Sequence, residues 1–120
     1  MLSLYAGQID FGPRQPPSFS ISVVSTGPAD CSFNVGPAGL ALVIKEGQVR
    51  VWSSADCVSG PGGLISALKR GVPTVLPITW NRQTSAPGCS GPAAQVPPGA
   101  YTAYAADGWL SSTPLTFRLS

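Results

Sequence analysis

Apolar and polar side chains alternate with a period of two residues along most of this chain. In residues 18–24, Phe19, Ile21 and Val23 fall on one side and serines fall on the other. Similar runs occupy residues 31–35, 39–44, 48–52, 64–68, 74–80, 100–106 and 115–119, and a weaker one lies within 2–11. Because successive side chains of a strand point to opposite faces, each run predicts a strand with one buried face.

Glycine and proline separate these runs. The 14 glycines and 13 prolines among 120 residues leave little room for long helices. Residues 45–47 predict a short hairpin connection, and residues 69–73 predict a second one. About seven to nine short strands at this spacing predict an all-β fold, an immunoglobulin-like antiparallel β-sandwich that forms a single domain over residues 1–120.

The apolar side of each run supplies the expected core. Its members are Phe19, Ile21, Val23, Phe33, Val35, Leu40, Leu42, Val51, Ile78, Leu115 and Phe117. Pro77 interrupts the run at 74–80 and cannot donate a ladder hydrogen bond. We therefore expect this strand at the edge of a sheet, or with a bulge at the proline.

The chain contains no histidine, and its aspartates and glutamates total 5. Histidine is the usual general base near neutral pH and the commonest metal ligand. Ser-His and Cys-His catalysis and histidine-bound zinc are therefore excluded, and the few carboxylates each adjoin a turn. We expect a protein that is not an enzyme and that carries no cofactor and no metal site.

The net charge of +2 comes from basic residues that are spread singly, except for Lys69 and Arg70. Nucleic-acid binding calls for a basic stripe with interleaved aromatic residues, and the sequence has none. The longest apolar run, at residues 39–44, is too short to span a bilayer. No signal peptide follows Met1, so the chain is either cytoplasmic or a trimmed form whose export segment has been removed.

The three cysteines favour an oxidising compartment, because Cys31, Cys57 and Cys89 all fall at strand ends or in loops. If strands joined by short turns are antiparallel, Cys57 and Cys89 reach the same end of the sandwich and Cys31 the other. A disulfide needs Cα atoms within about 7 Å. We therefore predict a Cys57–Cys89 disulfide and a free thiol at Cys31, which would allow a dimer if exposed; three free thiols are the alternative.

Residues 81–99 are the longest segment without periodicity, and long loops in compact domains are usually functional or covalently tied down. Arg82 is the only charged residue in this segment, which makes it a candidate polar contact for a partner. A plain solvated arginine is the alternative. We place the expected binding surface at the end of the sandwich that carries this loop and residues 57–63.

Two aromatic residues are further candidates. Trp109 follows Asp107 and Gly108 in a hairpin-like turn, where an exposed indole can anchor a protein interface. Tyr101 follows Pro98-Gly99-Ala100, and its hydroxyl is a candidate for the tyrosine corner that bonds backbone across one end of a sandwich.

Two stretches at the start of the chain resemble a known class of domain. Phe-Gly-Pro-Arg-Gln-Pro-Pro-Ser-Phe at residues 11–19 is followed by Ser-Val-Val-Ser-Thr-Gly at 22–27. This pattern is similar to the start of many bacterial immunoglobulin-like envelope domains. Trp-Ser-Ser-Ala-Asp-Cys at residues 52–57 resembles secreted or membrane-anchored actinobacterial proteins of unassigned role.

Further motifs are similar, in their order, to the Bacillus-type intracellular proteinase inhibitor domain. They are Val-Arg-Val-Trp-Ser-Ser at 49–54, Leu-Lys-Arg-Gly at 68–71, Thr-Trp at 79–80 and Pro-Gly-Ala-Tyr at 98–101. The sequence departs from that domain at Arg70, where proline is usual, and in its long cysteine-bearing loop. Because fold does not imply function, the resemblance implies the fold more directly than the inhibition.

Taken together, these features predict a non-catalytic domain, exported or membrane-tethered, that binds a protein or a cell-wall component. We expect an extracellular or cell-envelope location, with the cytoplasm as the alternative. A proteinase inhibitor is the second hypothesis, and it would present an extended loop, residues 81–99, to a protease.

Overall fold

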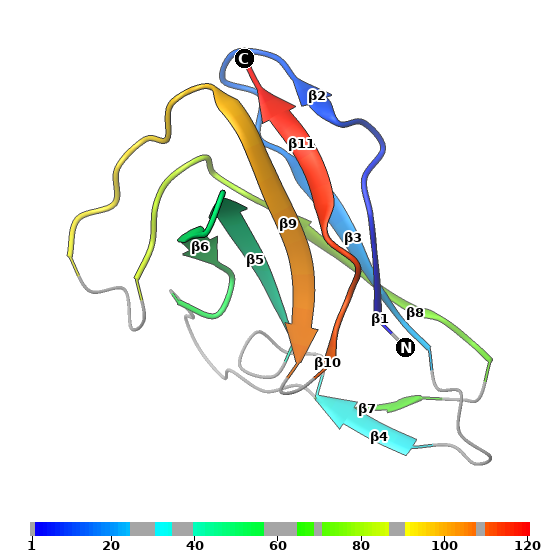
Figure 1. Cartoon of the computed structure of the whole chain (residues 1–120). Helices are drawn as coiled ribbons and strands as arrows, with labels where there is room; N and C mark the ends of the chain where they lie inside the picture. Colours follow the sequence, from blue (N-terminus) through cyan, green and yellow to red (C-terminus); the bar gives the residue numbers. More distant parts are fainter. Residues whose placement is uncertain are drawn as a thin grey trace.

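The structure is a computed structural model that describes residues 2–24, 31–34, 40–56, 65–68, 71–86, 91–107 and 110–120, with the backbone alone at 31–34, 65–68 and 110. Every helix or strand in these ranges is a β-strand (Figure 1). No described segment forms a helix of the length and apolarity that crossing a membrane requires. The all-β class predicted from the alternation is confirmed.

The smaller of two main sheets has three antiparallel strands in the order β1–β3–β8. They are β1 (Leu2–Tyr5), β3 (Ser18–Val23) and β8 (Thr74–Thr79). Pro77 lies on β8 and pairs with Ser20 of β3, and β8 is an edge strand of this sheet. The edge position predicted from the proline is confirmed, because an edge strand leaves one row of backbone groups without a ladder partner.

The larger sheet has the order β2–β11–β9–β5–β6, and β10 pairs with β9 beside this path. Its strands are β2 (Asp10–Phe11), β5 (Ala41–Glu46), β6 (Val49–Ser53), β9 (Gly99–Asp107), β10 (Leu110–Ser111) and β11 (Leu115–Leu119). β2 runs parallel to β11, and the other pairs are antiparallel. Gly47, with φ 60°, lies in the turn of the predicted β5–β6 hairpin.

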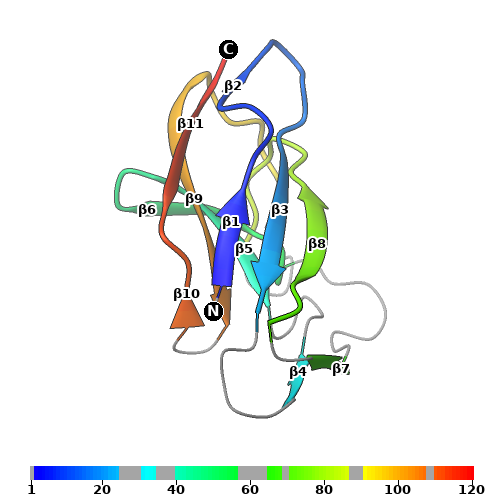
Figure 2. The same cartoon turned by 90° about the vertical axis from the view of Figure 1, so that its right-hand side faces the viewer.

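The remaining two strands form a separate antiparallel ribbon of β4 (Cys31–Asn34) and β7 (Ile65–Leu68). Figures 1 and 2 place this ribbon at the end of the sandwich where β3 ends and β8 begins. The hairpin expected across residues 69–73 is therefore wrong, since β8 pairs with β3. That pairing sets Leu76 and Ile78 opposite Ile21 and Phe19, which extends the apolar face over the core.

The small sheet contains the equivalents of the first, second and fifth strands of an immunoglobulin-like sandwich, and the large sheet contains the equivalents of the third, sixth and seventh. Eleven strands are described, more than the seven to nine predicted. The two strands beyond nine are β2 and β10, since the weak first run contributes both β1 and β2. Two-residue strands carry too little alternation to be recognised in a sequence.

The core lies between the two sheets and is rich in aromatic rings. Phe19 of the small sheet meets Phe117 of the large sheet at 5.2 Å between ring centroids. Trp80 has no exposed surface and contacts both Tyr101 and Phe117, with centroids 5.8 Å and 6.2 Å away. These rings join the two sheets into one hydrophobic cluster.

Most of the predicted core is confirmed. The predicted core residues that are buried are Phe19, Ile21, Val23, Leu40, Leu42, Val51 and Phe117. Two others, Ile78 and Leu115, are partly buried and pack against the cluster. The side chain of Phe33 and the whole of Val35 lie outside the described residues. Trp80 and Tyr101 join the centre of the core without having been predicted there.

Candidate functional site

The segment that connects β8 to β9 folds back on itself. Gln83 and Gln95 form an antiparallel bridge between its two halves. Thr84 N donates to Ala94 O at 2.8 Å, and Val96 N donates to Arg82 O at 3.0 Å. The described parts of this segment are therefore paired, unlike the extended loop that the missing periodicity predicted.

Arg82 binds this segment to the end of the sandwich that carries residues 12–15 and Ser120. Its Nη1 donates to Gly12 O at 2.8 Å and Gln15 O at 3.3 Å, and its Nη2 donates to Ser120 O at 2.8 Å. Only 8% of the residue is exposed. The exposed polar contact expected at Arg82 is not found. Its guanidinium instead donates hydrogen bonds to backbone carbonyls that lie outside the sheet ladders.

The backbone of Arg82 adopts a left-handed conformation with φ 61°. Few non-glycine residues do so, and the strain costs about 1–3 kcal/mol. Trp80 Nε1 donates to Gln83 O at 2.9 Å across this bend, which fixes the buried indole to the same turn. The hydrogen bonds of the arginine and the tryptophan together hold a strained backbone in place.

A second polar network joins β6 to the same segment. Asp56 is buried, and its carboxylate accepts hydrogen bonds from Arg50 Nη2 and from the Ser85 hydroxyl. Ser85 N also donates to Val51 O at 3.0 Å, and Ser53 N donates to the Ser85 hydroxyl at 3.2 Å. The network brings the chain just before residue 57 next to the chain just before residue 87.

The cysteine and tryptophan predictions fall largely outside this description. Cys57, Cys89 and Trp109 lie outside the described residues, and for Cys31 the backbone alone is described, opposite Leu68 in the ribbon. The Cys57–Cys89 disulfide and the free thiol at Cys31 therefore stay predictions. The contact between Asp56 and Ser85 nevertheless brings together the segments that precede Cys57 and Cys89.

Tyr101 is buried, with 1% of its surface exposed, and its hydroxyl donates to Pro97 O four residues upstream. This is the geometry of a tyrosine corner, as its position after Pro98-Gly99 predicted. Burial raises the pKa of Tyr101 to about 12, the Glu46 carboxylate adds to this shift, and the Arg82 guanidinium opposes it. The phenol therefore stays protonated and keeps its hydrogen bond at neutral pH.

Three of the described carboxylates lie far apart, and the fourth is bound to an arginine. Glu46 follows Lys45, which pairs with Thr102 on β9, so the distance along β9 to Asp107 is on the order of 20 Å. Asp10 lies on β2, and two strands separate it from β5, which carries Glu46, a gap of roughly 14 Å. Burial raises the pKa of Asp107, and Asp56 is bound to Arg50.

These separations decide what chemistry the described acids can perform. Hydrolysis of a glycosidic bond by two carboxylates needs them roughly 5–10 Å apart on either side of the bond. Asp10, Glu46 and Asp107 are farther apart than that. Among the described residues, no group of three or more histidine, cysteine or acidic side chains could hold a metal ion.

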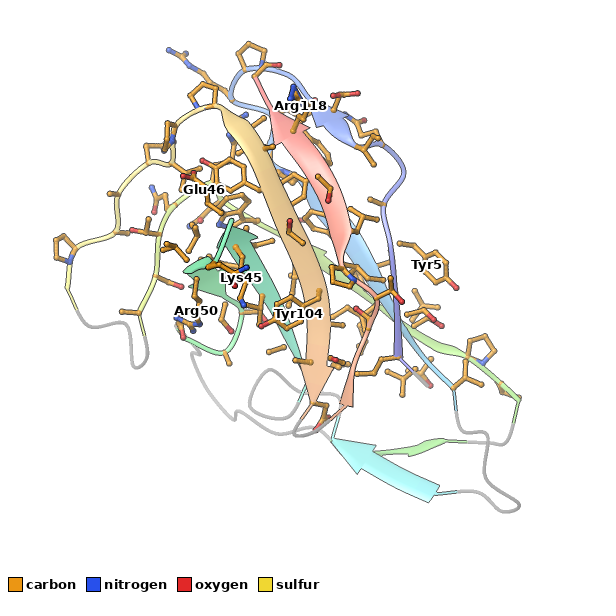
Figure 3. All side chains as sticks on the ribbon, in the orientation of Figure 1. Tyr5, Lys45, Glu46, Arg50, Tyr104 and Arg118 are labelled. Carbon is orange, nitrogen blue, oxygen red and sulfur yellow. The ribbon has the colours of Figure 1, made fainter. Side chains whose placement is uncertain are left out.

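The outer face of the small sheet carries an uncharged surface that we call the serine face. Its six central residues are Tyr5, Ser18, Ser20, Ser22, Val75 and Pro77, of which Ser22 is buried and Ser20 is half-buried. The register places Tyr5, Ser20 and Pro77 in one row across the three strands, with Ser22 and Val75 in the next. Figure 2 views this sheet from its outer side, and Figure 3 shows Tyr5 pointing away from the sandwich.

The outer face of the large sheet differs in character, because it carries charges. Lys45 Nζ lies 5.7 Å from the centroid of the Tyr104 ring, a cation–π contact (Figure 3). Arg118 and Asp10 are neighbours across the β2–β11 pair. The two sheets of the sandwich therefore present chemically different surfaces.

Sequence reasoning used the alternation at residues 18–24 only to find the core. The same pattern also places Ser18, Ser20 and Ser22 on the opposite face, so it contained the signal for the centre of the serine face. The rest of that face could not be found, because Tyr5 and Pro77 come next to the serines only through pairing of distant strands.

Comparisons with known proteins bear on the fold alone. No family model matches the sequence, and no curated protein matches it either. The structure is similar to a β-glucosidase, EmGH1, from Erythrobacter marinus, with TM-score 0.64 and 16% identity over 100% of this chain and 15% of that one. It is also similar to a β-glucosidase from Listeria innocua in complex with glucose, with TM-score 0.62 and 6% identity over 100% of this chain and 16% of that one. This chain thus corresponds in fold to about a sixth of each of these longer chains.

Proposed function

We propose that this chain is a non-catalytic domain of an exported or membrane-tethered protein and that it binds another protein or a cell-wall component. The observation that carries the proposal is the separation of Asp10, Glu46 and Asp107, together with the engagement of Asp56 by Arg50. The chain also has no histidine. Binding needs neither a carboxylate pair nor a general base.

The structural neighbours are compatible with such a role. Their titles name β-glucosidases, and this chain corresponds to only 15–16% of each. A domain of this fold therefore occurs as a small part of longer enzymes.

The proteinase-inhibitor hypothesis gains no specific support. An inhibitory loop must lie extended in a protease cleft, whereas Arg82, Gln83 and Thr84 are hydrogen-bonded or paired within the fold. Ser85 is also bonded to the buried Asp56. We therefore keep the interaction domain as the single proposal.

Co-sedimentation of the purified domain with isolated cell walls and with insoluble polysaccharides tests the proposal. We expect a saturable bound fraction that an unrelated β-sandwich of similar charge does not show. Titration against subtilisin-like and trypsin-like proteases is the control for the proteinase-inhibitor hypothesis, and inhibition there would overturn our proposal. A signal peptide, lipobox or transmembrane helix encoded upstream in the full-length gene would support export.

A further inference from the structure

β8 is the longest of the strands that end the two main sheets. It has six residues, whereas β1, β2 and β6 have four, two and five (Figure 2). Part of the β6 edge is also covered, because Ser85 N donates to Val51 O and Ser53 N donates to the Ser85 hydroxyl. A long edge strand is a template on which a strand of another chain can add.

The register shows which backbone groups of β8 bond to β3. Just beyond the two strands, Trp80 N donates to Pro17 O at 2.9 Å. Hydrogen-bonded and non-hydrogen-bonded pairs alternate along an antiparallel ladder. Leu76 and Ile78 therefore belong to hydrogen-bonded pairs with β3.

The alternate residues of β8 direct their backbone groups to the free edge of the sheet. These residues are Val75, Pro77 and Thr79. Within the described chain, their backbone groups form no hydrogen bond at that edge. Because proline has no N–H, Pro77 removes no bond from the ladder with β3 but removes the central donor of the free edge.

Pro77 is the edge-protecting feature that β8 contains. Proteins protect edge strands with charged side chains, with a bulge or with proline. Within β8, all of which is described, no residue is charged, and the six pairs with β3 run without a register shift. Its other residues are threonine, valine, leucine and isoleucine, and short uncharged runs of such residues without proline tend to pair with one another. The protection of this edge therefore depends on one residue.

We propose that Pro77 prevents the β8 strands of two copies of this chain from pairing edge to edge. In the symmetric antiparallel pairing with the most ladder bonds, Pro77 lies opposite Pro77 of the second copy, and Val75 lies opposite Thr79. Both hydrogen bonds of the central pair are then missing, and two pyrrolidine rings occupy the space between the strands. The inference does not depend on which ligand the domain binds.

Sedimentation velocity of the parent and of Pro77→Thr tests the proposal. A reductant in the buffer removes any crosslink through Cys31. Threonine restores the missing N–H and favours a strand, and no bond to β3 changes, so the variant should fold as the parent does. We expect Pro77→Thr to shift to dimers or larger species as its concentration rises, and the parent to show no shift over the same range.

Two further variants are matched controls. Pro16→Thr makes the same chemical change at an exposed proline outside the strands and should sediment as the parent does. Val75→Lys added to Pro77→Thr places a charge on the edge strand and should restore parental sedimentation. An unshifted, folded Pro77→Thr overturns the proposal, as does an equal shift of Pro16→Thr or association that persists with the added lysine.

Amide hydrogen exchange of the parent tests the geometry of the edge without any variant. The N–H groups of Val75 and Thr79 should exchange at least about tenfold faster than those of Leu76 and Ile78, which bond to β3. In Pro77→Thr, residues 75, 77 and 79 should become protected as the protein associates. Protection of Val75 and Thr79 in the parent equal to that of Leu76 and Ile78 would mean that this edge is already covered, and it would overturn the proposal.

Discussion

Replacement of Arg82 by alanine tests how the long connection between β8 and β9 is held. The guanidinium donates to carbonyls of Gly12, Gln15 and Ser120, and it is nearly inaccessible to water. Arg82→Ala removes all three hydrogen bonds at once. It also leaves the carbonyls of Gln15 and Ser120 without this donor, whereas Gly12 O still accepts from Gln15 N at 3.1 Å.

The expected loss follows from the geometry of these bonds. A hydrogen bond to a charged group contributes about 1.5–3 kcal/mol, and two of the three are short, at 2.8 Å. Water can reach part of the space that the side chain leaves, which lowers the total. We therefore expect the free energy of unfolding to fall by about 3 kcal/mol, and the melting temperature by about 12 °C for a domain of this size.

Urea unfolding followed by tryptophan fluorescence measures this loss. Trp80 is a suitable probe because its buried indole bonds Gln83 O beside the arginine. Arg118→Ala is the matched control, since Arg118 is exposed, and it should change stability by less than about 0.5 kcal/mol. A change of the same small size for Arg82→Ala would refute the claim that this residue fastens the segment.

Further predictions concern Tyr101 and the cysteines. Tyr101→Phe removes the bond to Pro97 O and should cost about 1 kcal/mol in the same urea assay; an unchanged midpoint would contradict the tyrosine corner. Because the pKa of Tyr101 is raised from 10.0 to about 12, its contribution is complete below pH 10 and is lost as pH rises toward 12, so alkaline unfolding should lack this component in Tyr101→Phe. Mass mapping of non-reduced peptides should give a Cys57–Cys89 crosslink and an unpaired Cys31, and any crosslink containing Cys31 would reject that pairing. Asp56→Ala should destabilise the fold by about 2 kcal/mol or more, since it leaves Arg50 and the Ser85 hydroxyl without their acceptor, and a neutral result would reject the role given to this network.

The alternation in the sequence was enough to predict the class of fold and the positions of most strands. Ser18–Val23 and Leu115–Leu119 appear within a residue or so of the predicted bounds, because each has a strictly alternating face. Partners of strands were harder to predict. The short link between residues 68 and 74 favoured a hairpin, but β8 packs onto β3, where it covers the core.

The candidate site was less accessible from the sequence for a related reason. Arg82 looked like the one charge of an exposed loop, and nothing local reveals that carbonyls of Gly12 and Ser120 converge on it. Contacts between residues so far apart depend on the tertiary fold. Tyr101 was predictable because its partner, Pro97, is only four residues away.

Hydrolysis of an aryl β-glucoside by the purified domain tests the central claim, that this is a binding domain without catalytic activity, most directly. The substrate is chosen because the titles of the structural neighbours name β-glucosidases. We predict a rate equal to that of the buffer alone, with no difference between the parent and Glu46→Gln. A rate above the buffer that Glu46→Gln abolishes, in a variant with unchanged folding, would contradict the account.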